Sequence, residues 1–145
     1  MIIVLAADHG GFKLKEEIKK YLKETRSDIK LVDLGTDKEE PVDYPIYGKA
    51  AAEAVASKKA DLGIVCCGTG IGISIAANKV KGIRCGLVTS IETAELTKKH
   101  NNANMIALGG RTTDTELAKK MVDAWLDSEF MGQHHIKRIE MLNNM

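Results

Sequence analysis

The amino-acid sequence predicts an α/β protein, built as a doubly wound, three-layer α/β/α sandwich around a five-stranded parallel sheet. Five short runs rich in valine, isoleucine and leucine alternate with longer amphipathic stretches, which is the pattern of consecutive βαβ units. The length of 145 residues is typical of one domain, and 44% hydrophobic with 28% charged residues is ordinary for a folded globule. We therefore expect one Rossmann-like domain over residues 1–145.

The first half of the chain supplies two strands and two helices. Ile2–Ala7 is a continuous apolar run that predicts the first strand, and apolar residues then recur at i, i+4, i+7 and i+8 from Leu14, which predicts a helix with one apolar face. Lys30–Asp33 is a second, weaker strand. After the turn-rich segment LGTDKEEPVD, an alanine-rich helix is expected over 45–57, with Pro45 tolerated in its first turn.

The second half supplies three strands and four helices. Residues 62–66 are predicted as a strand that leads into a glycine-rich turn and a helix over 73–79, and residues 83–88 form the fourth strand. Two Thr-x-x-Glu sequences, starting at Thr89 and Thr113, are predicted capping boxes that open helices. The remaining elements are expected over 89–100 (helix), 105–108 (strand), 113–126 (helix) and 134–142 (C-terminal helix).

Charge and cysteine content exclude several function classes. Twenty-one Lys and Arg balance twenty Asp and Glu for a net charge of +1, which is too little for electrostatic capture of nucleic acid or of an acidic membrane surface. The three cysteines show no C-x-x-C spacing, so we expect no metal site and a reduced, cytoplasmic setting. No apolar run approaches the roughly 20 residues that span a bilayer, and the start MIIVLAADHGG lacks the basic region of a signal peptide.

Ligands of doubly wound sheets bind at the carboxyl ends of the strands. The most informative loop there is CGTGIG at 67–72, because glycines at a strand-to-helix turn let backbone N–H groups approach an anionic oxygen. Its spacing is not the G-x-G-x-x-G of dinucleotide-binding loops and lacks the Lys-Ser/Thr ending of a P-loop. Ile73 stands where a Cys-x5-Arg phosphatase loop requires arginine. An anion cradle is favoured, and a purely structural turn stays open as the alternative.

Cys67 is the candidate base or nucleophile. It lies where a strand ends and a helix is about to begin, and a helix N-terminus favours the thiolate over the thiol. The alternative is a buried core residue, as free cysteines often are. Cys66 is expected to point to the opposite face of the sheet, and Cys85 to lie in the core.

Polar residues follow the first strand and a later helix. Asp8 and His9 would offer an acid or acceptor and a switchable donor, although Asp8 could instead cap the first helix and His9 could be solvated. His100 and Asn101 lie at a helix end, where a histidine could simply complement the helix dipole. A shared position of Asp8, His9 and His100 at the ligand-binding edge would favour catalysis.

Cationic residues gather at two further places. Arg111 follows a Gly-Gly pair at a strand end, while His134, His135 and Arg138 form a basic cluster that could equally be a solvated face. A thiol, histidines, an anion cradle and cations, without a metal motif, indicate proton transfer on a small phosphorylated molecule.

Several motifs together resemble the type B ribose-5-phosphate isomerases, over nearly the whole chain and in the correct order. The string CGTGIGISIAANK is long and specific. The matching motifs are AADHGGFKLK near the start, DYP at 43–45, CGTGIGISIAANK at 67–79, KGIR at 81–84, HNNAN at 100–104, ALGGR at 107–111 and the basic C-terminal motif. The same family includes galactose-6-phosphate and allose-6-phosphate isomerases.

The resemblance implies an isomerase of the pentose phosphate pathway. The expected enzyme is a metal-independent intramolecular oxidoreductase without a cofactor, which interconverts ribose 5-phosphate and ribulose 5-phosphate through a cis-enediolate. Residues 1–145 would be one sugar-phosphate isomerase domain with a C-terminal helix from about 134. The chain would form a homodimer whose active sites draw on both subunits, and a tetramer stays open.

The resemblance also implies roles for individual residues. Cys67 would be the base that shuttles a proton between C1 and C2, and His100 the acid that opens the furanose ring. The hydroxyl of Thr69 and backbone N–H groups would meet the enediolate oxygens, while other side chains would orient the sugar or hold the phosphate. In that order the substrate-binding residues are Gly68, Gly70, Ile71 and Gly72 for the oxygens, Asp8, Tyr44 and Asn101 for the sugar, and His9, Arg111 and Arg138 for the phosphate.

Two positions depart from patterns common in the family. The usual C-terminal Arg-His-x-x-Arg begins here with His134, which makes His134 a candidate member of the phosphate clamp. Some relatives have a carboxylate at the position of Ile73, which serves as the base in place of the cysteine. Isoleucine cannot accept a proton, so Cys67 is left as the candidate base in this chain. Two alternatives stay open: a six-carbon aldose-6-phosphate isomerase, and a non-catalytic phosphosugar-binding module, which would need neither Cys67 nor His100.

Overall fold

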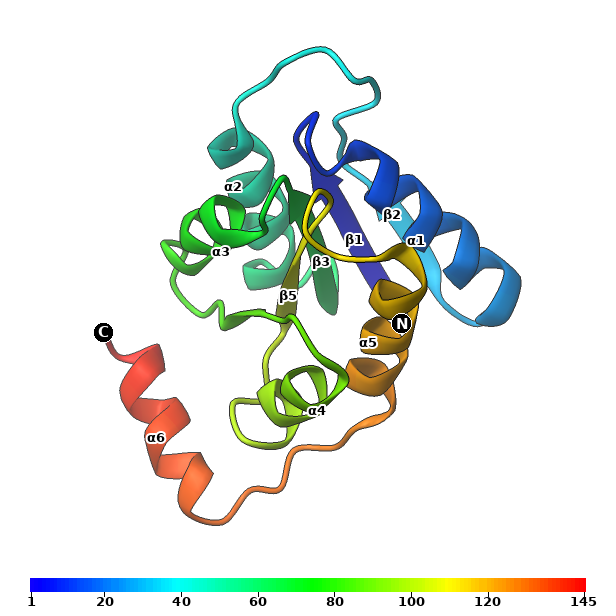
Figure 1. The fold of residues 1–145 in the computed structure, drawn as a ribbon. Coiled ribbons are helices and arrows are strands. Elements are labelled where there is room, and N and C mark those ends of the chain that lie inside the picture. The colour runs from blue at the N-terminus through cyan, green and yellow to red at the C-terminus, as the bar shows by residue number, and fades with distance from the viewer.

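The computed structural model describes residues 1–145 and confirms the predicted α/β sandwich (Figure 1). One sheet contains the five strands in the order β2-β1-β3-β5-β4, and all neighbours are parallel. The elements in chain order are β1 (Ile2–Ala7), α1 (Phe12–Thr25), β2 (Lys30–Asp33), α2 (Tyr44–Ala56), β3 (Leu62–Cys67), α3 (Ile71–Asn78), β4 (Cys85–Leu87), α4 (Ile91–Lys99), β5 (Met105–Gly109), α5 (Thr115–Asp127) and α6 (His134–Asn143).

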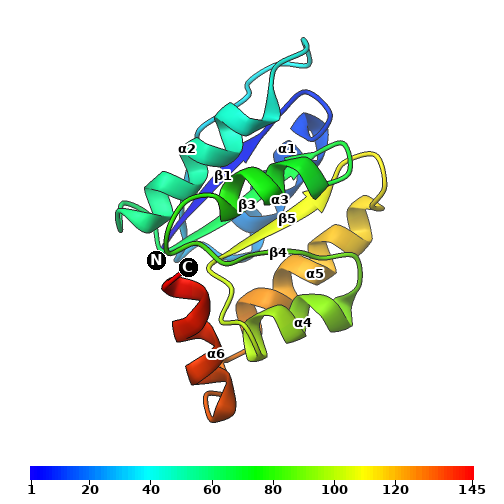
Figure 2. The same cartoon turned by 90° about the vertical axis from the view of Figure 1, so that its left-hand side faces the viewer.

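The sheet has a buried core on each face. Successive residues of β1 alternate between the two cores: Ile3 and Leu5 join the cluster under α1, α4 and α5, while Val4 and Ala6 join the cluster under α2 and α3. Figure 2 shows α2 and α3 on one side of the strands and α4 and α5 on the other. Because both faces are covered, the three inner strands β1, β3 and β5 contain no charged residue.

A buried tryptophan fastens α5 to the end of α4. The Trp125 side chain is fully buried, and its indole N–H donates to the Ala103 carbonyl at 3.1 Å. The Lys98 ammonium lies 5.4 Å from the centroid of the indole ring, within the range of a cation–π contact. The turn that follows α4 is therefore packed against the core on one side.

A buried lysine fixes the loop that follows β2. Lys15 is 1% exposed, and its ammonium donates to the Asp33 carboxylate at 2.8 Å and to the Thr36 carbonyl at 2.6 Å. In the same loop the Gly35 carbonyl accepts from the Ala7 N–H at 2.6 Å. These bonds hold the start of the 34–43 segment against the carboxyl end of β1.

Strand ends differ from the sequence prediction by one or two residues. β3 continues to Cys67, which pairs with Gly109 of β5. β4 is shorter than the predicted 83–88 because asparagine side chains take the place of strand partners at its start. The Asn78 amide accepts from the Cys85 N–H at 2.8 Å and donates to the Cys85 carbonyl at 2.9 Å, and Asn104 Oδ1 accepts from the Arg84 N–H at 2.9 Å.

The predicted capping box of α4 is displaced by one residue, whereas α5 is capped one residue later than predicted, by a single side chain and with no capping box. In α4 the Ser90 hydroxyl accepts from the Thr93 N–H, and Thr93 Oγ1 accepts from the Ser90 N–H, so the box starts after Thr89. In α5 the carboxylate of Asp114 accepts from the Leu117 N–H at 3.3 Å. Serine and aspartate outrank threonine as N-cap residues, and the negative charge of Asp114 suits the helix N-terminus.

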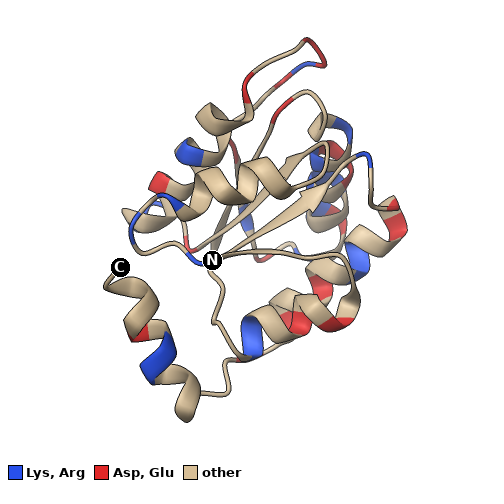
Figure 3. Cartoon of the chain, turned by 60° about the vertical axis from the view of Figure 1, so that its left-hand side comes forward, with Lys and Arg blue, Asp and Glu red and all other residues tan.

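Helix α6 projects from the sandwich at the amino ends of the strands. Figures 1 and 2 both show it below the sheet, reached by an extended segment that leaves α5. Positively and negatively charged residues are interspersed along the helices (Figure 3), in keeping with the net charge of +1. None of the helices combines the length and the apolar character needed to span a bilayer.

Candidate active site

Three loops meet at the carboxyl edge of the sheet, after β1, β3 and β5. The Asp8 N–H donates to the Cys66 carbonyl at 3.2 Å, and the Arg111 N–H donates to the Gly68 carbonyl at 2.9 Å. A β-carbon at Gly110 would lie 2.4 Å from the Gly10 carbonyl oxygen, so only glycine permits this approach of two backbones. The predicted ligand-binding edge is therefore a rigid platform.

Cys67 ends β3 with its thiol directed at the turn. Its Sγ accepts a hydrogen bond from the Gly70 N–H at 3.2 Å, and the residue is 4% exposed. Gly70 has a φ of 79°, a left-handed conformation that glycine adopts without strain. The hydrogen bond from the Gly70 N–H fixes the sulfur at the turn, at the carboxyl end of β3. The geometry suits Cys67 for accepting a proton.

The other two cysteines belong to the cores, as predicted. Cys66 joins the cluster on the opposite face of the sheet from Cys67. Burial raises the pKa of the Cys66 thiol far above its usual range and raises the pKa of Cys85 to about 12. Both therefore stay protonated at neutral pH.

The turn after Cys67 offers N–H groups without protein partners. The N–H of Gly70 is engaged by Cys67, and the N–H of Ile71 donates to Thr69 Oγ1 at 3.2 Å. The N–H groups of Gly68 and Gly72 donate to no protein atom. Of the four predicted backbone donors, two are thus free for a ligand, and two shape the turn.

Two side chains enclose this turn. The Tyr44 ring lies against Gly72, where a β-carbon would come within 2.6 Å of its ring carbons. The Arg111 guanidinium covers Gly68, with Nη1 3.3 Å from the position of a β-carbon there, and Arg111 forms no ion pair. An aromatic hydroxyl and an unpaired cation therefore flank the free N–H groups.

Asp8 and His9 are both fixed by backbone N–H groups. The Asp8 carboxylate is 6% exposed and accepts from the N–H groups of Gly10 and Gly11 at 2.9 and 3.1 Å, so it closes the turn before α1 rather than being solvated. His9 Nδ1 accepts from the Val42 N–H at 3.1 Å. With Nδ1 occupied as an acceptor, the neutral ring carries its proton on Nε2 and can donate from there.

The remaining predicted site residues lie at the opposite edge of the sheet. His100 follows the last residue of α4, and its ring stacks on that of His135 of α6, with centroids 4.5 Å apart and planes at 14°. The expectation that His100 shares an edge with Asp8 and His9 is wrong within one chain. A helix that follows a parallel strand runs back across the sheet, so the C-terminal end of α4 lies near the amino ends of the strands (Figure 2).

His135, which the sequence places only in a general basic cluster, lies between two of the candidate site residues. Its ring lies between those of His100 and His134, 4.1 Å from the latter, and it is 8% exposed. Burial, together with the positive charge that His134, His100 and Arg138 can carry, lowers the pKa of His135. The three adjacent imidazoles, one pair stacked and the other tilted at 40°, thus contain a neutral ring at their centre at neutral pH.

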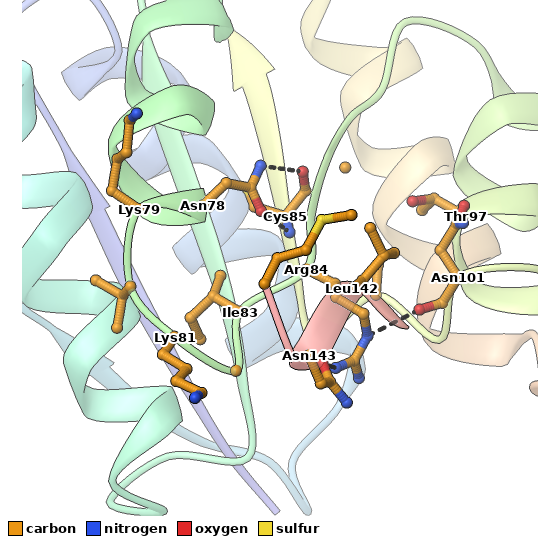
Figure 4. Close-up of a pocket in the computed structure, with 15 residues that line it drawn as sticks. Asn78, Lys79, Lys81, Ile83, Arg84, Cys85, Thr97, Asn101, Leu142 and Asn143 are labelled. Atoms are coloured by element: carbon orange, nitrogen blue, oxygen red, sulfur yellow. Dashed lines mark hydrogen bonds between the residues drawn. The ribbon is translucent and has the colours of Figure 1, made fainter. Parts of the chain in front are cut away.

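A cavity of about 460 Å³ opens beside Asn101, the residue that follows His100 (Figure 4). It lies between the segment that precedes β4, the end of α4 and the end of α6. Among the predicted site residues only Asn101 lines it, and Cys67 does not. No group of three or more His, Cys, Asp or Glu side chains is arranged to hold a metal ion.

Several known proteins resemble this chain over almost its whole length. A ribose-5-phosphate isomerase B of Escherichia coli is 44% identical over 140 residues, covering 97% of this chain and 93% of that protein. A galactose-6-phosphate isomerase subunit, LacB, of Clostridium acetobutylicum is 44% identical over 146 residues, covering 98% and 83%. The structure of a ribose-5-phosphate isomerase B of Clostridium thermocellum is 46% identical, with a TM-score of 0.96 over 99% of this chain and 96% of that one.

The sequence model of a family described as "Ribose/Galactose Isomerase" matches residues 3–142 of this chain. That range includes every residue placed above at either edge of the sheet. The chain therefore belongs to the ribose/galactose isomerase family.

Proposed function

We propose that this protein interconverts ribose 5-phosphate and ribulose 5-phosphate by proton transfer through a cis-enediolate. The observation that carries the proposal is the Cys67 thiol, held by the Gly70 N–H beside the unpartnered N–H groups of Gly68 and Gly72. The named activity of the relatives from E. coli and C. thermocellum supports the same reaction. The enzyme would be a single isomerase domain that acts in the cytoplasm on the pentose phosphate pathway.

The chemistry requires a base and a place for negative charge. Cys67 would remove the proton from the carbon atom next to the carbonyl carbon. It would then return the proton to the former carbonyl carbon. The enediolate oxygens would be met by the free N–H groups and by the hydroxyl of Thr69, whose Oγ1 already accepts from Ile71 and so keeps its proton for donation. Loss of one such preorganised donor costs about 3–4 kcal/mol of transition-state stabilisation in other enzymes.

The sugar and the phosphate would extend across the carboxyl edge. Asp8 and Tyr44 would orient the sugar hydroxyls, and His9 would donate from Nε2 to the phosphate beside Arg111. Because these groups supply proton transfer, orientation and charge, the proposed reaction uses neither a metal nor a cofactor.

We propose that the second half of each site comes from a second copy of the chain. His100, Asn101, His134 and Arg138 lie at the amino edge, away from their own Cys67, while α6 projects outwards. On α3 two isoleucines one turn apart, Ile71 and Ile75, are 51% and 55% exposed beside the Cys67 turn. Such a patch suits contact with another chain. In the proposed homodimer the amino edge of one subunit covers the carboxyl edge of the other, and a tetramer would be two such dimers.

A mixture of two inactive variants tests the shared site. Cys67→Ala and His100→Ala should each abolish most turnover of ribose 5-phosphate. Co-refolding them in equal amounts should restore about a quarter of wild-type activity, because half of the dimers are mixed and each mixed dimer has one intact site of two. A mixture as inactive as its components, with mixed dimers demonstrated by mass spectrometry, would place both residues in one subunit's site.

A six-carbon sugar phosphate is the alternative substrate, because this chain is also similar to the galactose-6-phosphate isomerase subunit of C. acetobutylicum. Steady-state kinetics with ribose 5-phosphate, allose 6-phosphate and galactose 6-phosphate side by side would separate the two, and kcat/KM should be highest for ribose 5-phosphate. Incorporation of solvent deuterium at C2 of ribose 5-phosphate tests catalysis itself. Binding without exchange would make the protein a phosphosugar-binding module.

A further inference from the structure

Arg84 belongs to the KGIR segment at 81–84, to which the reaction assigns no role. It stands immediately before β4, and its side chain crosses to the end of α4 and to α6 (Figure 4). The guanidinium donates from Nε to the Asn101 carbonyl at 3.0 Å, from Nη2 to the Asn102 carbonyl at 3.0 Å and from Nη1 to Asn143 Oδ1 at 2.8 Å. One side chain therefore joins three elements.

The two carbonyl groups lie in the turn that ends α4. Asn102 has a φ of 43°, and its N–H donates back to the Lys98 carbonyl at 3.0 Å, while the Ala103 N–H donates to the Thr97 carbonyl at 3.0 Å. Carbonyls at the end of a helix have no partner within it and carry the negative end of the helix dipole. Arg84 supplies both the missing donors and a complementary charge.

The acceptors of Arg84 are all neutral. Arg84 forms no salt bridge, and no Asp or Glu lines the adjoining cavity. Burial without a carboxylate partner lowers the pKa of Arg84. Its hydrogen bonds to carbonyl oxygens therefore offset the hydration that the guanidinium loses on partial burial.

Arg84 is itself held at its backbone. Its N–H donates to Asn104 Oδ1 at 2.9 Å, and the next residue, Cys85, is paired through both its N–H and its carbonyl with the Asn78 amide. A side chain whose backbone is anchored and whose guanidinium makes three hydrogen bonds can transmit position to the groups it binds. The groups it binds are the backbone of Asn101, next to His100, and the end of the helix that bears His134, His135 and Arg138.

We propose that Arg84 is a positioning residue, which sets the His100–Asn101 turn and α6 as one unit so that both reach the substrate in fixed geometry. The proposal rests on the proposed function for its effect on turnover. The three hydrogen bonds to the turn and to α6 carry it, and the stacking of His100 on His135 links the two parts that Arg84 joins.

The test compares Arg84→Met and Arg84→Lys with Lys81→Met. Lys81 lines the same cavity and lies in the same segment but forms no hydrogen bond with the turn, so its variant is the matched control. Arg84→Met should lower kcat for ribose 5-phosphate by about tenfold to a hundredfold, as expected for a displaced catalytic group. Arg84→Lys should fall between, because one ammonium cannot serve both carbonyls in the fork geometry. Lys81→Met should match the wild type.

The same substitutions in a His100→Ala background separate positioning from general damage. If Arg84 acts partly through His100, Arg84→Met should cause a smaller fold-loss in the residual proton exchange of His100→Ala than in the wild type, by the logic of a double-mutant cycle. An equal fold-loss in both backgrounds would overturn the proposal. Thermal unfolding identifies a variant that fails to fold, and in that event Arg84→Lys supplies the same comparison.

A readout independent of activity separates this proposal from the proposed function. Long-range proton–nitrogen NMR of the imidazole rings should show the His100 resonances shifted in Arg84→Met and unchanged in Lys81→Met. Unshifted His100 resonances in a folded Arg84→Met would overturn the positioning role. A protein without isomerase activity but with the expected shifts would overturn the proposed function alone.

Discussion

Replacing Gly72 by alanine should move Tyr44 out of the site while leaving the fold intact. A β-carbon at this position, the second residue of α3, would lie 2.6 Å from two ring carbons of Tyr44 and 3.0 Å from its hydroxyl. Favourable carbon contacts begin at about 3.5 Å, so the ring must retreat by roughly 1 Å. The Tyr44 side chain is 40% exposed, so it can turn into solvent without displacing backbone.

Two opposing effects set the magnitude. Loss of one hydrogen bond from Tyr44 to the sugar would cost about 0.5–1.5 kcal/mol, or up to roughly tenfold in kcat/KM. Alanine in place of glycine within a helix stabilises by about 0.5–1 kcal/mol, which the strain of moving the ring opposes. In a Tyr44→Ala background the ring is absent, and only the stabilisation remains.

Four proteins are needed: the wild type, Gly72→Ala, Tyr44→Ala and the double variant, each measured by kcat/KM for ribose 5-phosphate and by urea unfolding. We expect the three variants to share one reduced kcat/KM, and Gly72→Ala to raise the free energy of unfolding only in the Tyr44→Ala background. A further loss of kcat/KM in the double variant would refute the reasoning, since the effect would then act through the free N–H of Gly72 rather than through Tyr44.

Three further predictions concern the thiol, metals and pH. Cys67→Ala should abolish isomerisation while calorimetry still detects phosphosugar binding, and Cys66→Ala should stay active because it faces the core; the reverse result would reassign the base. Treatment with EDTA should leave turnover unchanged, and a loss restored by a divalent ion would contradict the proposed mechanism. Because burial lowers the pKa of His135, the unfolded chain binds that proton more readily, so this contribution to stability is complete above about pH 6.5 and falls as the pH drops below it. His135→Phe should flatten that part of the stability profile, and an unaltered slope would show that other groups cause it.

The periodicity of the sequence determined most of the fold. Apolar runs placed β1, β3 and β5 most clearly, because strands covered on both faces consist almost entirely of apolar residues, whereas the edge strand β2 begins with Lys30 and ends with Asp33. The predicted element ends are wrong where side chains, rather than backbone groups, form the hydrogen bonds to the backbone. Asn78 and Asn104 shorten β4 by acting as strand partners, and Ser90 displaces the capping box of α4 from Thr89. Such hydrogen bonds depend on tertiary position, which periodicity does not encode.

The sequence predicted which residues share the carboxyl edge of the sheet, but it did not predict that His100 lies at the opposite edge. Loops after parallel strands share an edge by topology, and Asp8, Cys67 and Arg111 are brought together accordingly. His100 was assigned to that edge because its chemistry fits there, but the direction of α4 carries it to the other end of the sheet. Two of the three partners of Arg84 are backbone carbonyls of a turn distant in sequence, and no residue type in the sequence marks them.

The single tryptophan makes one end of this molecule visible to fluorescence. Trp125 is the only tryptophan in the chain, and its indole N–H is bonded to Ala103, directly after the turn that holds His100. Its emission is therefore expected at short wavelength while that turn is packed, and a shift to the red would record loosening of the end of α4 before the sheet melts. The carboxyl edge around Cys67 contains no such chromophore. A ligand that changes the emission must then have altered the amino edge, and the same optical signal would follow the approach of another subunit in real time.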